Sequence, residues 1–273
     1  MKRSVFFLSD RTGITAEMLG LSLLTQFEGV EFDHAILPFL DTAAKAEQAV
    51  QEINKAAAQQ GTRPLLFSTI IDEQIRHIIS QSNGLLFDLF ATFISQLESE
   101  LHSPSSTLVG RTHGRGAEEK YKERMDAVNF ALSNDDGISA RNYPAADIIL
   151  VGVSRSGKTP TCLYLALQYG IKAANYPLTE EDMGSSQLPT ILTPYRKKLF
   201  GLSINPLRLQ EIREERRANS RYSSLAQCEF EVQSVEKIFH RERVAFIDSS
   251  SASIEEIATT IIHQCGLNRR LLG

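Results

Sequence analysis

Hydrophobic and polar residues in the first hundred positions follow two alternating periods. Short runs rich in β-branched and aromatic residues predict strands, and these runs lie at residues 5–8, 32–37, 64–70 and, as the weakest, 85–87. Stretches with helical spacing separate them. Because strands that alternate with helices are typical of βαβ units and a mainly parallel sheet, we predict an N-terminal Rossmann-like α/β domain.

Two of the predicted helices have clear apolar faces. The first runs over residues 42–60 with Asp41 or Thr42 as its N-cap, and its apolar positions, at helical spacing, are Ala46, Val50, Ile53 and Ala57. The second ends before Pro104, and its wide apolar face is formed by Leu86, Leu89, Phe90, Phe93, Ile94, Leu97 and Leu101.

The periodicity breaks at residues 102–117, which are rich in Ser, Gly, Thr and His and contain Pro104. Such a composition predicts a connecting loop. A helix over residues 118–133 and a turn at 134–137 follow. We therefore predict an N-terminal domain over residues 1–105, a connecting loop and helix over 106–145, and a second domain over 146–273.

The second domain begins with a buried strand at residues 148–151, a glycine-rich turn and an apolar helical run. Strand, turn and helix in this order are what a phosphate-binding loop requires. Further strands are predicted at residues 171–175, 199–204 and 244–247. These patterns predict an α/β domain of the P-loop, kinase-like type.

Composition narrows the class of protein. The chain has 273 residues, of which 42% are hydrophobic and 23% charged, as expected for an ordinary globular protein of about two domains. A net charge of −4 gives no electrostatic footprint for sequence-independent nucleic-acid binding. No apolar run approaches the ~20 residues of a membrane span. The three cysteines, Cys162, Cys228 and Cys265, form no CxxC pair, which favours a reducing, cytoplasmic compartment.

The strongest motif is the segment 152–159, which satisfies the GxxxxGK[ST] pattern of a phosphate loop in full. Its glycines permit backbone conformations that turn successive N–H groups towards a phosphate, and the following helix presents its positive end. Lys158 would contact the terminal phosphates and Thr159 a magnesium ion. The predicted nucleotide-binding residues are Gly152, Val153, Ser154, Arg155, Ser156, Gly157, Lys158 and Thr159.

Downstream of this loop lies a segment in which arginine and glutamate alternate. Its basic residues are Arg213, Arg216, Arg217 and Arg221. Such a pattern also fits a solvated helix face with i,i+3 and i,i+4 ion pairs. Because phosphoryl transfer needs movable cations, we favour an arginine-rich lid.

Four residues are candidates for a catalytic acid or base. Asp135 and Asp136 precede Gly137 in a turn, and they also suit a general base or a magnesium ligand. Asp248 follows the last predicted strand, where open α/β sheets place ligand-binding residues. His113 lies in a cationic, glycine-flanked loop between the proposed domains.

Six segments resemble a known family: 9–17, 111–114, 135–137, 152–161, 173–177 and 213–222. Together they are similar to the phosphoenolpyruvate synthase regulatory proteins, a bacterial family of bifunctional kinases and pyrophosphorylases, over essentially the whole chain. A sister branch that acts on pyruvate, phosphate dikinase carries Ser at the position of Gly157, so Gly157 favours the synthase branch.

The resemblance implies a kinase that uses ADP to phosphorylate a threonine of phosphoenolpyruvate synthase and thereby inactivates it. It also implies the reversal, in which inorganic phosphate attacks the phosphothreonine and pyrophosphate leaves. We expect Mg²⁺ beside Thr159, the β-phosphate on Lys158, and the arginines closing over both. One of Asp135, Asp136, Asp248 or His113 would accept the threonine proton, and the sequence leaves that choice open.

Two other functions compete with this reading. A phosphate loop followed by an arginine-rich segment also fits a small-molecule kinase, or a nucleotide-sensing regulator without enzymatic activity. The expected partners are the synthase and a nucleotide, without nucleic acid or membrane. A homodimer is one option for the assembly, which the sequence leaves open.

Overall fold

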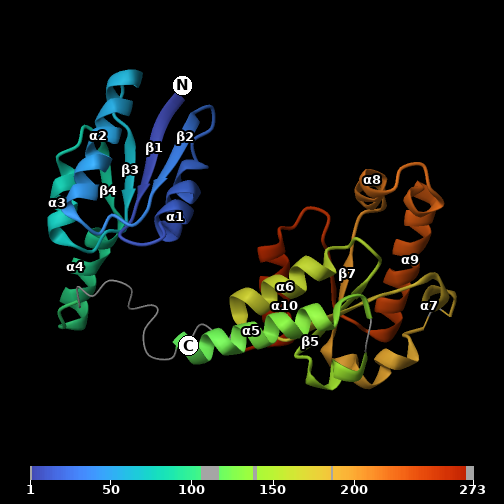
Figure 1. Cartoon of the computed structure of the whole chain (residues 1–273). Helices are drawn as coiled ribbons and strands as arrows, with labels where there is room; N and C mark the ends of the chain where they lie inside the picture. The colour runs from blue at the N-terminus through green and yellow to red at the C-terminus, as the bar shows by residue number, and fades with distance from the viewer. Residues whose placement is uncertain (1, 106–116, 138–139, 186, 269–273) are drawn as a thin grey trace. The chain divides into compact units, whose positions relative to one another are not determined.

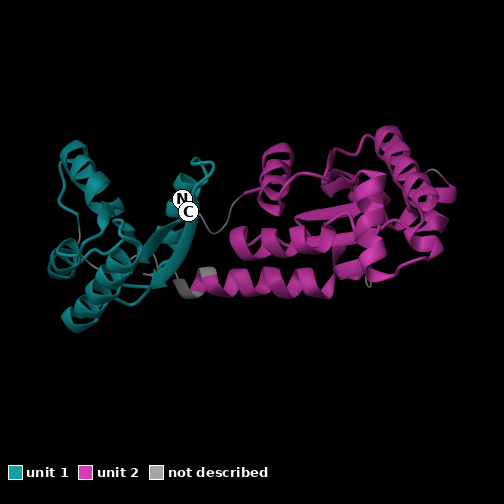
Figure 2. Ribbon diagram, turned by 90° about the horizontal axis from the view of Figure 1, so that it is seen from above, with its two compact units in different colours: residues 1–114 teal, residues 115–273 magenta. Residues whose placement is uncertain are grey.

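Two four-stranded sheets, each with all its strands parallel, organise the chain. The structure is a computed structural model that describes residues 2–105, 117–137, 140–185 and 187–268. Each sheet belongs to one of two compact units, residues 1–114 and 115–273 (Figure 1 and Figure 2). The predicted α/β class, Rossmann-like in the first unit and P-loop-like in the second, is confirmed.

The first unit has the strand order β2-β1-β3-β4. Its strands are β1 (Lys2–Leu8), β2 (Glu31–Leu37), β3 (Leu65–Ser68) and β4 (Leu85–Asp88). The alternation of β1 divides its side chains between the two faces of the sheet. Val5 and Phe7 pack on the side of the first helix, and Phe6 and Leu8 pack against the next two helices.

Helices cover both faces of this sheet (Figure 1). They are α1 (Ile14–Leu24), α2 (Ala43–Gln60), α3 (Glu73–Ser80) and α4 (Leu89–Leu101). The predicted N-cap of α2 is Thr42, whose hydroxyl accepts a 3.4 Å hydrogen bond from the N–H of Lys45. Ala46 and Ile53 of the predicted apolar face are fully buried against the sheet.

The predicted helix before Pro104 differs from the structure in two respects. Leu86 belongs to β4 rather than to the helix, which begins at Leu89 because Asp88 accepts a hydrogen bond from the N–H of Ala91 and caps it. The apolar face is also largely open, since Phe93 and Leu97 are 56% and 55% exposed. The spacing that predicts an apolar face therefore does not by itself predict burial.

The second unit has the strand order β6-β5-β7-β8. Its strands are β5 (Ile148–Gly152), β6 (Ala173–Pro177), β7 (Leu199–Ser203) and β8 (Phe246–Asp248). β5 lies between β6 and β7, and Gly152 is in register with Pro177 on one side and Leu202 on the other. The loop after β5 thus leaves the sheet where neighbouring connections diverge, which is where open α/β sheets bind ligands.

Two helical layers enclose this sheet. The helices are α5 (Ala117–Ser133), α6 (Lys158–Tyr169), α7 (Glu180–Gly184), α8 (Pro206–Arg216), α9 (Leu225–Glu242) and α10 (Ile254–Cys265). Short 3₁₀ helices are η2 (Asp135–Gly137), η3 (Ala140–Ala145), η4 (Thr190–Lys198) and η5 (Arg221–Ser223). Ile148 and Leu150 pack with α5, α6 and α10, whereas Ile149 and Val151 pack with α8 and α9.

Helix α5, which the sequence assigns to a connecting segment, belongs to the second unit and packs on α6. Its buried residues Ala127 and Ala131 join the same core as Leu165. Through this packing, α5 delivers the turn η2 to the end of β6, next to the phosphate loop. In the described ranges, no helix combines the length and apolarity that a bilayer crossing needs.

Candidate functional site

The segment between β5 and α6 has the backbone of an anion-binding loop. Gly157 is the N-cap of α6 and has φ +88°. Because glycine has no side chain, it makes no side-chain cap at the positive end of α6, the end of a helix that binds anions. Gly152 has no room for a side chain, because a Cβ there would lie 2.3 Å from the carbonyl oxygen of Leu202. Arg155 also has a positive φ, +76°, as alternating conformations of an anion nest require.

Lys158 is buried beneath this loop. Its Nζ donates hydrogen bonds to the carbonyl oxygens of Val153, at 2.7 Å, and Gly152, at 3.2 Å. Burial lowers the pKa of Lys158 to about 8, although the negative charge of Asp136 acts in the opposite direction. The ammonium group is therefore held by its own loop, in the position from which it would contact phosphate oxygens.

Thr159 and Asp135 meet at the edge of the loop. The Thr159 hydroxyl donates to Oδ1 of Asp135 at 2.8 Å, and the Asn175 side-chain amide donates to the same oxygen. The amide oxygen of Asn175 accepts a 2.8 Å hydrogen bond from the backbone N–H of Asp136. Asn175, in the middle of β6, thus joins the turn η2 to the phosphate loop.

Asp135, Lys158 and Thr159 line one cleft with a volume of about 520 Å³, and Asn175 is not among its lining residues. It combines cations, carboxylates and a hydroxyl, and Pro160 and Ile212 add an apolar wall. Apart from Pro160 and Ile212, the lining residues are Asp135, Asp136, Ser154, Arg155, Gly157, Lys158, Thr159 and Arg216. The structure therefore brings both predicted aspartates and five of the eight predicted loop residues to the same cavity, whereas Gly152, Val153 and Ser156 do not line it.

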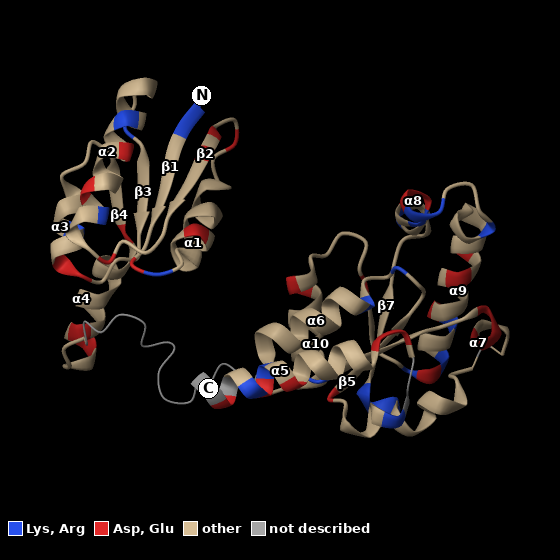
Figure 3. Cartoon of the chain, viewed as in Figure 1, with Lys and Arg blue, Asp and Glu red and all other residues tan. Residues whose placement is uncertain are grey.

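The four arginines of the predicted lid divide among different environments. Helix α8 carries both acidic and basic residues (Figure 3), and only Arg216 of the four lines the cleft. Arg217 and Arg221 line a separate pocket of about 290 Å³, where Arg221 pairs with Glu180 at 3.3 Å. The prediction of a movable lid cation is wrong for Arg213, which is fully buried and ion-paired with Glu231.

Of the two other candidate bases, the structure places only Asp248, which does not line the cleft. The carboxylate of Asp248 accepts hydrogen bonds from the N–H and hydroxyl of Ser250, and Asp248 is not among the residues lining the cleft. Its neighbour Ser249 donates to the carbonyl oxygen of Ser156 at 3.0 Å and so braces the loop from outside the cleft. His113 lies outside the described residues.

The oxygen donors of the cleft suit Mg²⁺. That ion is held in proteins by one or two carboxylates together with hydroxyl, water and phosphate oxygens, and Asp135, Asp136 and Thr159 provide two carboxylates and a hydroxyl. Across the described ranges, no three His, Cys, Asp or Glu side chains gather to hold an ion alone.

Sequence reasoning missed two residues that shape the site, Asn175 and Tyr222. Asn175 is the last residue of the strand predicted over residues 171–175, and this place at the carboxyl end of a predicted strand was the available signal. The hydroxyl oxygen of Tyr222 lies 3.2 Å from the hydroxyl oxygen of Ser154. Both lie in segments that carry the family resemblance, 173–177 and 213–222.

The fold and the cleft define an α/β protein with a P-loop-like domain and a candidate site at the carboxyl end of its sheet. The chain matches the model of the kinase/pyrophosphorylase family over residues 5–262. The chain belongs to this family, and the resemblance seen in its motifs is confirmed.

Named relatives match along almost their whole length. One from Pseudomonas aeruginosa (strain LESB58) is 57% identical over 99% of this chain and 98% of its own. Another, from Stutzerimonas stutzeri (strain A1501), is 56% identical over 99% of this chain and 100% of its own. A third, from Pseudomonas putida (strain W619), is 55% identical over 99% of both chains. All three carry the name "Putative phosphoenolpyruvate synthase regulatory protein".

Proposed function

We propose that this chain regulates phosphoenolpyruvate synthase by reversible phosphorylation. In the inactivating direction, a threonine hydroxyl of the synthase attacks the β-phosphorus of ADP, the bond to the α-phosphate oxygen breaks, and AMP leaves. In the reactivating direction, inorganic phosphate attacks the phosphothreonine, pyrophosphate forms, and the threonine oxygen recovers a proton. Family membership and the names of the relatives support this proposal.

The observation that carries it is the composition of the cleft. Phosphoryl transfer needs cations that neutralise the transferring group and an acceptor for the hydroxyl proton. Lys158 and Arg216 provide cations in the same 520 Å³ cavity as the carboxylates of Asp135 and Asp136. The glycine-framed loop between β5 and α6 adds backbone N–H donors for the phosphates.

The hydrogen bonds suggest different roles for the two aspartates. Oδ1 of Asp135 already accepts from Thr159 and Asn175, so we assign Asp135 to hold Mg²⁺ together with Thr159. Asp136 is tied to Asn175 through its backbone N–H, a bond that does not involve its carboxylate, and among the described residues no hydrogen bond engages that carboxylate. We assign Asp136 to accept the threonine proton. Mg²⁺, when bound, would neutralise charge on the phosphate oxygens.

The same phosphate loop serves both reactions in this proposal. Phosphate that attacks the phosphothreonine would occupy the place that the α-phosphate of the leaving nucleotide takes in the inactivating direction. Lys158 is then required in both reactions, because the same phosphoryl group moves along the same line.

The test mixes the purified protein with phosphoenolpyruvate synthase and with ADP labelled on its β-phosphate or ATP labelled on its γ-phosphate. We expect label from ADP on a synthase threonine, together with loss of synthase activity. Phosphate added after removal of the nucleotide should release that label as pyrophosphate and restore activity. The Lys158→Met variant serves as the control for the phosphate loop.

Three results would refute the proposal. Labelling of the synthase by ATP alone would overturn the choice of donor. Transfer of label only to a small molecule would indicate a metabolite kinase. Stoichiometric inhibition of the synthase that leaves no covalent phosphate would indicate a nucleotide-sensing regulator.

A further inference from the structure

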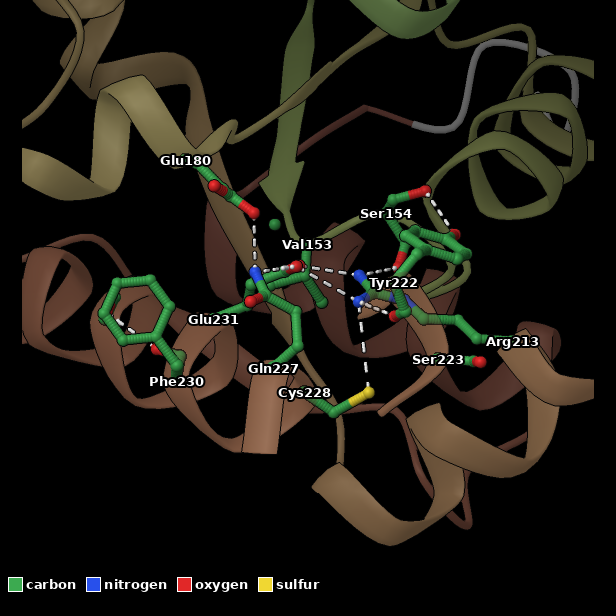
Figure 4. A network of polar contacts seen from close by, with 12 residues as sticks. Val153, Ser154, Glu180, Arg213, Tyr222, Ser223, Gln227, Cys228, Phe230 and Glu231 are labelled. Atoms are coloured by element: carbon green, nitrogen blue, oxygen red, sulfur yellow. Dashed lines mark hydrogen bonds and ion pairs between the residues drawn. The ribbon is translucent and has the colours of Figure 1, made fainter. Parts of the chain in front are cut away.

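Arg213 is the largest of the fully buried side chains in the described part of the chain. Its guanidinium group forms a two-pronged ion pair with Glu231 of α9, with Nη1 to Oε1 at 3.2 Å and Nη2 to Oε2 at 2.7 Å (Figure 4). Burial alone would lower the pKa of Arg213, but the hydrogen bond and charge of Glu231 outweigh burial and raise it. Arg213 is therefore a permanent buried cation, held between two helices.

The same guanidinium group reaches the phosphate loop (Figure 4). Nη2 donates to the carbonyl oxygen of Ser154 at 3.1 Å, and Nη1 donates to the carbonyl oxygen of Tyr222 at 3.0 Å. The guanidinium carbon stacks 4.2 Å above the centre of the Tyr222 ring. The Tyr222 hydroxyl also lies 3.2 Å from the hydroxyl of Ser154. Ser154 is therefore held at both its carbonyl oxygen and its side chain.

The anchored carbonyl belongs to the peptide group that joins Ser154 to Arg155. Arg155 adopts φ +76°, a left-handed conformation that costs a non-glycine residue energy and persists only where neighbours hold it. No cis peptide occurs among the described residues, so the Arg155 N–H points opposite to the Ser154 carbonyl. A carbonyl fixed towards Arg213 therefore aims the Arg155 N–H away from Arg213, while both loop residues line the cleft.

We propose that Arg213 is a positioning residue that sets the Ser154–Arg155 peptide for phosphate binding, with Glu231 as its counter-ion. This inference rests on the proposed function in so far as the loop binds a nucleotide. By the same contacts, Arg213 fixes helix α8 relative to the loop. Arg216 and Ile212 lie on this helix and line the cleft, so their positions are fixed as well. Helix α8 is then a fixed wall of the site.

The competing explanation is a purely structural ion pair, and a paired replacement separates the two. A buried ion pair exchanged for apolar residues of similar volume commonly leaves a protein folded. The double variant Arg213→Met/Glu231→Leu therefore removes both charges together and also removes the donor to Ser154. Arg208→Met/Glu211→Leu is the matched control, because this 2.8 Å ion pair lies on the same helix but is exposed.

Two measurements are made on each folded variant: ADP affinity by calorimetry, and hydrogen exchange of the amides in residues 152–159. We expect the double variant to bind ADP about tenfold or more weakly and its loop amides to exchange about tenfold faster. In the control, both quantities should stay within about twofold of wild type. Should the double variant fail to fold, Arg213→Lys retains the charge but cannot span Glu231, Ser154 and Tyr222 together.

The proposal is overturned when a folded variant lacking the Arg213 guanidinium shows wild-type exchange in the loop and wild-type ADP affinity. Absence of ADP binding by the wild type would refute the proposed function instead. In that event the exchange of the loop amides alone decides whether Arg213 positions the loop, since exchange needs no ligand. Tyr222→Phe removes only the hydroxyl contact to Ser154, and a smaller change in the same direction is expected.

Discussion

The Thr159 hydroxyl donates a 2.8 Å hydrogen bond to Oδ1 of Asp135. This bond connects the start of helix α6 to the turn η2, which follows α5 in the chain, and α5 packs on α6. Asn175 of β6 completes the connection. The candidate site is therefore assembled from three separate segments, and only one of them is the phosphate loop.

Replacing either aspartate by asparagine should separate their roles. The Asp135→Asn and Asp136→Asn variants remove one negative charge each with little change in volume, and we expect either to slow both reactions by about 10²–10⁴-fold. Asp135→Asn should additionally raise the Mg²⁺ concentration required for half-maximal rate, whereas Asp136→Asn should not. Initial rates of synthase phosphorylation and pyrophosphate release, measured across a Mg²⁺ series, check this.

Asp126, exposed on α5, gives the control variant Asp126→Asn, which should behave as wild type. The assignment of roles is wrong if both aspartate variants change the Mg²⁺ requirement equally. It also fails if Asp136→Asn retains the wild-type rate in either direction.

Removal of the buried ammonium group should weaken phosphate binding. Lys158→Met keeps most of the apolar stem but loses the donor to the carbonyls of Gly152 and Val153. We expect ADP affinity to fall by about 10²-fold, because a charged hydrogen bond to a phosphate is lost in a site shielded from water. Calorimetric titration of the variant with ADP checks this, with the exposed Lys197→Met as control. Equal affinities in wild type and Lys158→Met would contradict the role of this lysine.

The pKa of Lys158 predicts a dependence of nucleotide affinity on pH. Burial lowers this pKa to about 8. Below that value the amine is already charged in the free protein, so ADP affinity should be nearly constant. Above it, binding must first protonate the amine, and affinity should fall by up to about tenfold per pH unit. ADP titrations between about pH 7 and 9.5 measure this slope, and the same slope in Lys158→Met would assign it to another group.

The lowered pKa of Lys158 has the opposite effect on protein stability, which should increase as the pH rises. The folded-state pKa of Lys158 lies below the ordinary value of 10.5, so the unfolded chain binds more protons between about pH 8 and that value. The destabilising contribution of the buried ammonium group is present below about pH 8 and disappears as the pH rises through this window. Lysine burial is thus a cost that the free protein bears at neutral pH in order to keep the cation in place.

The phosphate loop could be predicted from sequence because its chemistry is local. The glycines at 152 and 157, the lysine and the threonine all fall within residues 152–159, where one strand ends and one helix begins, so the pattern and the site coincide. Asn175 could not be identified in the same way. Its role depends on the pairing of β6 with β5, which brings it beside Thr159 across the sheet.

Arg213 shows the other limit of sequence patterns. On α8 it alternates with glutamates, as an exposed residue would, and its actual partner is Glu231 on the next long helix. Burial of an arginine depends on whether a carboxylate from elsewhere meets it, which helical spacing does not report. The apolar residues of the run 85–94 fit the spacing of a strand and of a helix equally well, so the pattern does not decide between them. In the structure, this run forms the strand β4 first and then the start of the helix α4.

The exposed face of α4 gives a prediction about stability. Phe93→Ser and Leu97→Ser replace side chains that are 56% and 55% exposed, so each should change the free energy of unfolding by less than about 0.5 kcal/mol. Ile53→Ala, in the core between α2 and the sheet, should cost about 2–5 kcal/mol, because it leaves a cavity among fully buried neighbours. Urea unfolding of the three variants, followed by a signal from the first unit, compares them. A loss in Leu97→Ser that matches Ile53→Ala would show that this face of α4 is covered in solution.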